Sequence, residues 1–412
     1  MEILETSTVQ PGRRLARAIF TKEGNLLFSS GALLTEDRLL RLKTWGISSI
    51  AVESQVDPSS VGREPTQPED ILQAVRDMVA TRFKLHDLDN PQMRAVFELA
   101  VERHGRMMLG KGVKLITNAN SSPAFQTQRP PQVRMHTLID SSQRMGSLPT
   151  IFHRLVEVIN DPNSSPARIS KIVSMDPALT ARLLRLVNSP FYSFASRIDS
   201  ISRAVALVGT RQLVMLAMGA TLITAFKGVP VSLVSMQSFW AHSISCGAAA
   251  RQLALFCGLP ASESFFVAGL LHDISRLVIY SLLPNHTLYL LTEAKRRQIS
   301  VHTLEEEVLG FTHEELGAEL LRTWCCPDEL VQRVSSHHDS LSDATPAENL
   351  ILPVANTLTQ ALGYGSSGEI FVPPLPPEIW EFLAISPEAL LEECRILDDK
   401  VRELRTLLSP AR

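Results

Sequence analysis

The chain has 412 residues, of which 45% are hydrophobic, and carries 40 basic against 43 acidic residues, for a net charge of −3. This length predicts two or three domains, and the balanced charge gives no basic patch or tail of the kind that binds nucleic acid. Five scattered cysteines without a CxxC spacing argue against a thiolate zinc site and indicate reduced thiols of a cytosolic protein.

The N-terminal stretch, MEILETSTVQPGRR, has no apolar h-region, so we expect no signal peptide. The longest apolar runs, such as 213–226, hold about a dozen residues, whereas a membrane-spanning helix needs about 20. We therefore expect a cytoplasmic protein without a membrane segment.

Residues 1–56 predict a small α+β N-terminal domain made of short strands and one helix. Apolar runs at 15–20 and 26–28 flank a turn signal, Lys22-Glu23-Gly24-Asn25. Thr35 is a candidate N-cap for a short helix that Gly46 ends, and a further strand is expected to follow it.

The next region alternates between linkers and helices. Residues 54–68 are a linker by composition, and 69–112 predict a helical connector of two helices, broken near 87–91. Residues 117–134 are rich in Ser, Asn, Gln and Pro, and we place the main domain boundary there.

Over residues 136–360, apolar residues recur at three-to-four spacing, which predicts a mainly α protein with an all-α helical bundle domain. A C-terminal helical extension is expected over 376–408. Six of its residues repeat with heptad spacing: Leu390, Cys394, Leu397, Val401, Leu404 and Leu408. This seam covers less than three heptads, so a docked amphipathic helix and a homodimeric coiled coil are both open.

A tandem His-Asp lies at the polar point of an otherwise apolar helix, FFVAGLLHDISRLVIY. Histidines on neighbouring predicted helices extend it to a candidate metal-ligand set: His242, His272, Asp273, His313, His337 and His338. Such a set can hold Fe, Mn or Zn, and a bound ion activates water and clamps phosphate. The alternative is a vestigial site whose residues bond to each other without a metal. We discount His86-Asp87 as an isolated dipeptide, and His286 and His302 lack the setting of the others.

The stretch MDPALTARLLRLVNSPFYSFASRIDSISRAVALVG precedes these histidines. Asp176 is a good N-cap, and Pro177 is favoured at the first helical position. Asn188 can take a left-handed C-cap conformation or bond backbone groups of the next loop, and Pro190 stops the helix. A structural role therefore explains most of this stretch, and direct contact with a ligand or partner is the alternative.

This stretch, the later AGLLHDI and the order of the histidines resemble the HDOD family over about 220 residues. The resemblance implies an HD-like all-α bundle that serves as a bacterial signal-transduction output domain. The N-terminal domain resembles the small domains attached to bacterial HD-type signalling proteins, with a generic β-rich cap as the alternative.

The resemblance also bears on catalysis. His242, His272 and Asp273 occur in the order seen in HD-superfamily phosphohydrolases. The later histidines correspond to ligands of the HD-GYP branch, which hydrolyses cyclic dinucleotides. Two departures weaken that hypothesis: Asn356 stands where a carboxylate completes the HD-GYP site, and the Lys that often follows His-Asp is absent, the sequence continuing to Arg276.

We therefore predict a regulatory module without catalytic turnover, which requires no cofactor, assigns no catalytic residue and acts through other signalling proteins. A metal-dependent phosphohydrolase of cyclic dinucleotides or nucleotides is the alternative. A third hypothesis is a nucleotide sensor without hydrolysis, in which Arg276 or His337 contacts the ligand. If the side chains of the metal set converge within about 4–5 Å, a metal site stays open.

Overall fold

The structure is a computed structural model of the chain. It describes residues 2–6, 9–10, 12–16, 19–20, 26–28, 33–35, 38–39, 42, 49–52, 68–111, 129–145, 148–192, 194, 196–226, 229, 233–259, 263–339 and 346–408. The chain divides into two compact units. The first includes Met1–Ile71, and the second consists of Leu72–Val113 and Gln128–Arg412.

The first unit contains four short strands: β1 (Glu2–Glu5), β2 (Ile19–Phe20), β3 (Leu26–Phe28) and β4 (Ser49–Val52). Strand β1 pairs antiparallel with β4, and β2 pairs antiparallel with β3. The expected strands before and after the turn signal are therefore present. The turn itself and Gly46 lie outside the described residues.

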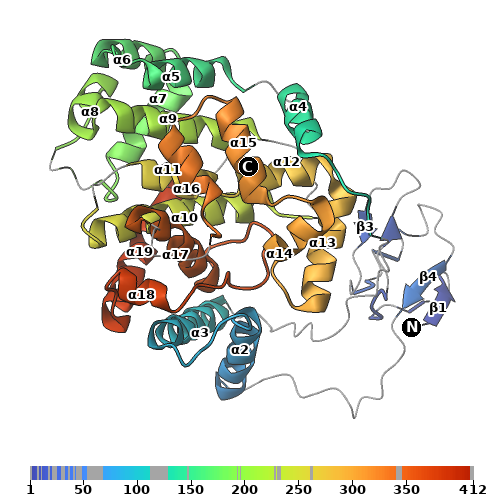
Figure 1. Cartoon of the computed structure of the whole chain (residues 1–412). Coiled ribbons are helices and arrows are strands. Elements are labelled where there is room, and N and C mark those ends of the chain that lie inside the picture. The colour runs from blue at the N-terminus through green and yellow to red at the C-terminus, as the bar shows by residue number, and fades with distance from the viewer. Residues whose placement is uncertain are drawn as a thin grey trace. The chain divides into compact units, whose positions relative to one another are not determined.

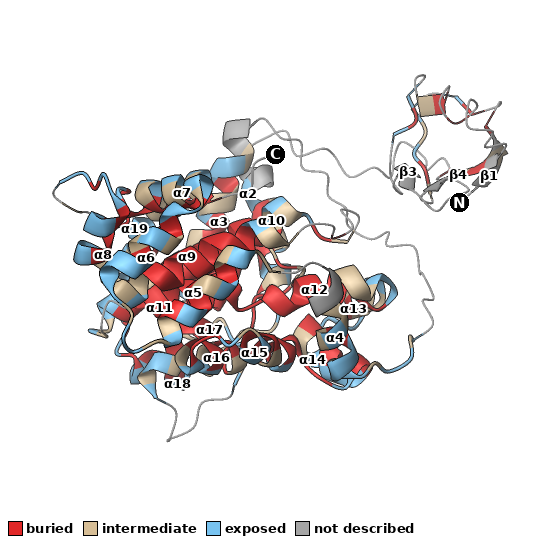
Figure 2. Cartoon of the chain, turned by 90° about the horizontal axis from the view of Figure 1, so that it is seen from above, coloured by how far each residue is buried: buried red, intermediate tan, exposed pale blue. Residues whose placement is uncertain are grey.

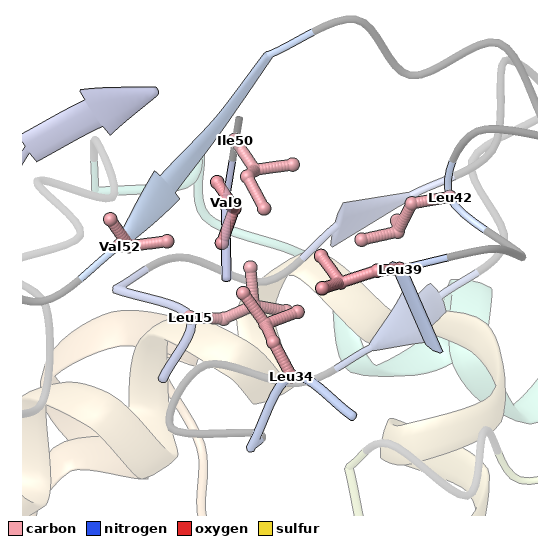
Figure 3. Close-up of a cluster of buried hydrophobic side chains, with 7 residues drawn as sticks. All are labelled: Val9, Leu15, Leu34, Leu39, Leu42, Ile50 and Val52. Carbon is pink, nitrogen blue, oxygen red and sulfur yellow. The ribbon is translucent and has the colours of Figure 1, made fainter. Parts of the chain in front are cut away.

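A small apolar cluster holds this unit together (Figure 3). Its buried members are Val9, Leu15, Leu34, Leu39, Leu42, Ile50 and Val52. The predicted N-cap is confirmed, because the backbone N–H of Arg38 donates to the Thr35 hydroxyl at 3.3 Å. This cap orients the short helical segment that contributes Leu39 and Leu42 to the cluster.

The second unit is helical, as predicted (Figure 1). Its first helix is α2 (Pro68–Arg82), of which residues 72–82 belong to this unit. It is followed by α3 (Pro91–Lys111), α4 (Met135–Met145), α5 (Thr150–Asn160), α6 (Pro166–Ser174), α7 (Pro177–Val187), α8 (Ile201–Val208) and α9 (Thr210–Ala225). The remaining helices are α10 (Met236–Phe256), α11 (Glu263–Leu271), α12 (Ile274–Leu282), α13 (Pro284–Arg297), α14 (Val301–Leu309), α15 (His313–Thr323), α16 (Asp328–Ser335), α17 (Ala347–Ala361), α18 (Glu378–Phe382) and α19 (Pro387–Leu408).

The ends of α7 follow from its sequence. The Asp176 carboxylate accepts the backbone N–H groups of Ala178 and Leu179, and a proline occupies the first position of the helix. At the other end Asn188 has φ −87° and ψ 0°, so the left-handed conformation is wrong. The alternative use of its side chain is found: its amide donates to the carbonyl of Ile198, and its oxygen accepts the Ile198 N–H, each at 2.7 Å. Asn188 therefore ties the end of α7 to the following loop.

Helix α10 lies at the centre of the second unit, where it packs against α11, α17 and α19. Figure 2 shows that α9, α10, α11 and α12 are buried over much of their length. The six heptad residues of α19 are each at most 3% exposed, and this helix packs against α10, α3 and α7. The heptad face is thus used within the chain, as in a docked amphipathic helix.

The two connector helices also pack on this unit, since α3 contacts α19 and α17. The backbone N–H of Val372 donates to the carbonyl of Arg82, and His86 Nε2 lies 2.8 Å from the carbonyl of Pro373. Residues 72–113 therefore belong to the helical unit by their contacts.

Among the described residues, Glu263–Leu282 is long and apolar enough to cross a membrane, with a mean hydropathy of 1.4. The bent pair α8 and α9 meets the same criterion if it is counted as one span. The expectation from uninterrupted apolar runs overlooked both segments. In the structure 89% of the Glu263–Leu282 window is buried, so here it forms core helices of the second unit.

Candidate metal or polar regulatory site

Close contact between α10 and α11 brings the first two histidines together. A side-chain carbon on Gly269 would lie 2.6 Å from the backbone N and Cα of Gly247, and one on Gly247 would lie 2.5 Å from the Phe266 carbonyl. Only glycine permits such an approach of two backbones. As a result His242 on α10 and His272 after α11 face each other, with 3.3 Å between their Nε2 atoms.

Asp273 lies at the break between α11 and α12, where it can face both histidines. One carboxylate oxygen, Oδ2, is 3.1 Å from His272 Nε2 and 3.7 Å from His242 Nε2. The other oxygen, Oδ1, is 3.1 Å from Nε2 of His313. The Asp273 carboxylate therefore bridges two groups of histidines.

His313 starts α15, where a capping box between Thr312 and Glu315 fixes the helix end. Its Nε2 lies 3.1 Å from Nε2 of His337, which follows α16. The adjacent His338 ring lies 4.4 Å from the His337 ring, centroid to centroid. Thus His313, His337 and His338 form a second group beside the first.

The outward ring nitrogens of three histidines face acceptors. Nδ1 of His272 lies 2.8 Å from the Gly269 carbonyl, and Nδ1 of His337 lies 2.7 Å from the Val334 carbonyl. Nδ1 of His313 lies 2.5 Å from the Glu305 carboxylate. Because a carbonyl or carboxylate only accepts, each Nδ1 carries a proton and each Nε2 is left to face the interior. Metal-ligating histidines are oriented in this way.

Arg276 on α12 places a fixed positive charge within the same cluster. Its Nε lies 3.3 Å from Asp273 Oδ1 and 3.6 Å from Glu305 Oε1, and its Nη2 lies 3.9 Å from Glu369 Oε2. Arg276 is only 2% exposed. Three carboxylates therefore share an internal counter-ion, which does not reach solvent.

These charges shift the titration of their neighbours. Burial opposes ionisation of His272 and Asp273, but their mutual attraction outweighs it: the pKa of His272 is well above and that of Asp273 well below the ordinary value. Burial and the nearby positive charge of His272 lower the pKa of His242 to about 3. Burial and Arg276 oppose protonation of His313, but Glu305 and Asp273 together raise its pKa to about 9.

In the part of the chain that the structure describes, His242, His272 and Asp273 are each at most 2% exposed. The space bounded by His242, Asp273, Arg276 and Asn356 measures about 10 Å³, which is close to the minimum that holds one water molecule. Small-molecule sites usually measure about 300–1,000 Å³. In this conformation a nucleotide does not fit beside the His-Asp pair.

The structure brings together every member of the predicted metal set. Donor atoms of His242, His272 and Asp273 lie within 4.8 Å of one another. The same holds for His313, His337 and His338, which the structure joins with Glu314: these four could hold a second ion. Asn356 lines the small cavity together with His242 and Asp273, so it lies at the site, as the sequence predicted.

Sequence reasoning missed four members of this cluster: His302, Glu305, Glu314 and Glu369. Setting His302 aside was wrong, because its ring stacks on His338 with centroids 4.3 Å apart and its Nε2 lies 3.0 Å from Glu314. Glu305 and Glu369 were also not anticipated. One signal was available for Glu305, which occupies a core-facing position four residues after Val301 on an apolar helix face.

The set of oriented imidazoles and a bridging carboxylate fits a transition metal. The buried Nδ1 of His242 also lacks a hydrogen-bond partner among the described residues. His242, His272 and Asp273 would hold one ion. The second unit is therefore an all-helical domain that holds a buried His-Asp cluster.

The comparisons with known proteins identify the domain. Residues 145–340 match the model of the HDOD domain. The chain therefore contains an HDOD domain, which confirms the family predicted from its motifs.

One relative, an uncharacterized protein of Treponema pallidum (strain Nichols), is 28% identical over 202 residues, which are 48% of this chain and 39% of the relative. This chain thus matches well under half of that protein's length.

Two solved structures share the fold. A protein of Shewanella amazonensis SB2B, provisionally named a phosphohydrolase, superposes with a TM-score of 0.53 at 22% identity, covering 67% of this chain and 100% of that one. A protein of Marinobacter aquaeolei VT8, provisionally named a signal transduction protein, gives a TM-score of 0.52 at 21% identity, covering 67% of this chain and 65% of that one. At these identities the likeness establishes the helical fold.

Proposed function

We propose that this chain is a regulatory module of bacterial signal transduction, acting through other signalling proteins and without catalytic turnover. One observation carries the proposal: the cluster that resembles a hydrolase site is closed and balances its own charge. Arg276 lies among the Asp273, Glu305 and Glu369 carboxylates, and the enclosed space of about 10 Å³ admits no phosphate ester.

Two residues that differ from those of a two-metal hydrolase site, Asn356 and Arg276, support the same function. Asn356 lines the cavity with a neutral amide where a carboxylate would complete a two-metal site. Arg276 already neutralises carboxylate charge that a second metal ion would otherwise balance. The cluster then serves to hold α10, α11, α12, α14 and α15 in one arrangement.

The test is hydrolysis by the purified full chain of a cyclic dinucleotide and of bis(p-nitrophenyl) phosphate, with Mn²⁺, Fe²⁺ or Zn²⁺ added. We expect no turnover above that of Asp273→Asn. His286→Asn is a matched control, because His286 is a buried histidine outside the cluster, bonded to the Pro131 carbonyl at 2.8 Å. Turnover that Asp273→Asn abolishes and His286→Asn keeps would overturn the proposal.

A specific observation favours a second candidate, the metal-dependent phosphohydrolase. Two groups of donor atoms lie side by side, each within 4.8 Å, which is the arrangement that two-metal hydrolases use. A bound ion there would lower the pKa of a coordinated water and bind phosphate oxygens. Metal analysis of the purified chain distinguishes three outcomes: no metal, one ion without turnover, and two ions with turnover.

Two further expectations belong to this proposal. A cytoplasmic location is checked by cell fractionation. A homodimer through α19 would have to use the exposed side of that helix, where Ile396 is 38% exposed, because the heptad face is buried within the chain. Light scattering of the purified chain measures whether such a dimer forms.

A further inference from the structure

A second polar region lies where α3, the start of α10, α19 and residues 363–365 meet. It is an open cleft of about 640 Å³. Its charged lining consists of four arginines and one carboxylate: Arg103, Arg106, Arg402, Arg405 and Asp398. Figure 1 shows α3 beside the C-terminal helices, and α3 and α19 are in contact.

The acidic side chains near the cleft leave its positive charge only partly balanced. Asp398 pairs with Arg103 and accepts the Tyr364 hydroxyl at 2.5 Å. Arg106 and Arg402 pair with Glu102 and Asp399 outside the lining, but all four side chains are more than half exposed, so these pairs contribute little. Among the described residues, Arg405 has no acidic side chain within ion-pair distance.

Arg103 is held in place before any ligand binds. Its guanidinium stacks on the Tyr364 ring at 4.2 Å from the centroid, and its Nε is buried without a hydrogen-bond partner. Burial, together with the positive charges of the three other arginines, lowers the pKa of Arg103. This mutual repulsion would be relieved by an anion in the cleft.

The backbone around the cleft is also fixed. Gly365, with φ +142°, packs so closely on α10 that a side-chain carbon would lie 2.3 Å from the Ser238 carbonyl. The Ser366 N–H donates to the Ser238 hydroxyl at 3.0 Å. Ser235, the N-cap of α10, and Gln237 in its first turn line the same space, where a helix carries partial positive charge.

We propose that this cleft binds a small phosphorylated ligand of nucleotide size through its arginines. Guanidinium groups match phosphate oxygens with paired, charge-assisted hydrogen bonds. The volume falls within the range of about 300–1,000 Å³ usual for small-molecule sites. An acidic protein segment is less favoured, because the charge is concentrated in one cleft bounded on several sides. This proposal is independent of metal binding or turnover at the His-Asp cluster.

Isothermal titration of the full chain with ATP and with inorganic tripolyphosphate tests the proposal. We expect both probes to bind, and Arg402→Gln or Arg405→Gln to weaken binding by about tenfold or more. Arg395→Gln is the matched control, because Arg395 lies on the same helix, pairs with Glu392 and does not line the cleft. The control should bind as tightly as the unmodified chain.

Three results would overturn the proposal: neither probe binds at millimolar concentration, the control loses as much affinity as the cleft variants, or poly-glutamate displaces ATP as well as tripolyphosphate does. Circular dichroism of each variant confirms folding first. Arg103→Gln is left out of this test, because the Arg103 guanidinium also stacks on Tyr364 and its loss would disturb the local packing.

Discussion

The His-Asp cluster and the arginine cleft lie along the same helix, α10, and differ in how their charge is balanced. At the cluster, Arg276, three carboxylates and several imidazoles are paired with one another around a space of about 10 Å³. At the cleft, four arginines and a single carboxylate line about 640 Å³ that is open to solvent. Residue types that are typical of catalytic sites therefore do not by themselves show where a ligand binds. Charged side chains that lack partners of opposite charge, next to a cleft open to solvent, are the more direct indicator.

The largest effect is expected from breaking the charge balance of the cluster. Arg276→Met leaves buried carboxylates without their shared cation, so the free energy of unfolding should fall by about 3–5 kcal/mol, measured by urea denaturation. Arg297→Met is the control, since the exposed Arg297–Glu307 pair should be worth less than about 1 kcal/mol. Equal losses in both variants would contradict internal pairing, and a loss that added Zn²⁺ restores would favour the metal-binding alternative.

The contact that sets the histidine spacing gives the next largest effect. Gly269→Ala places a carbon 2.6 Å from the Gly247 backbone, and such overpacking should cost about 2–3 kcal/mol. Gly105→Ala on α3 meets only the end of the Leu72 side chain at 3.0 Å, so its change should stay within about 1 kcal/mol. Thermal unfolding of both variants compares them, and a Gly269→Ala variant as stable as Gly105→Ala would show that the helices can separate freely.

At the cleft, removing the negative charge of Asp398 should strengthen anion binding and cost little stability. Asp398→Asn takes away the carboxylate that competes with a bound anion, so tripolyphosphate should bind several-fold more tightly. The free energy of unfolding should fall by only about 1 kcal/mol, because Asp398 is 36% exposed. Asp399→Asn, which is on the same helix but outside the lining, should change affinity less. Unchanged or weaker binding by Asp398→Asn would count against an anion site.

The smallest effect is expected on the pH dependence of stability, through His86 and His104 in the region of α2 and α3. Burial lowers the pKa of His86 and of His104 below the ordinary value of 6.5. The unfolded chain therefore binds more protons than the folded chain at lower pH, and stability should be lost as pH falls below about 6.5. His104 faces Arg82, at 3.2 Å, and the neighbouring Arg103. Urea unfolding at several pH values should show a shallower acid dependence for the double variant His86→Gln, His104→Gln; an unchanged slope would contradict this origin.

Much of the fold follows from local sequence signals. The Asp176-Pro177 start of α7 and the heptad face of α19 depend on residues close in the chain, so their patterns are visible in the sequence. Of the two roles left open for Asn188, the left-handed conformation is not adopted, and its side chain instead bonds Ile198, ten residues further on. Local rules do not include such loop contacts.

The candidate site was only partly predictable for the same reason. Histidines within apolar helices are rare enough to stand out, and His242 and His272 do converge, with His313 on the other side of Asp273. Glu369 and the cleft arginines lie on segments whose composition is that of ordinary polar surface. Arg103 and Arg402 are separated by about 300 positions, and only the docking of α19 on α3 brings both to one cleft.

The contact between Gly247 and Gly269 helps to decide which other sequences place two histidines in contact. Any larger residue at either position forces α10 and α11 apart, and the 3.3 Å separation of the His242 and His272 nitrogens would be lost with it. A His-Asp dipeptide alone is then a poor guide to a working histidine pair. Two glycines, one five residues after the first histidine and one three residues before the second, would serve as a filter for choosing which chains to test for metal.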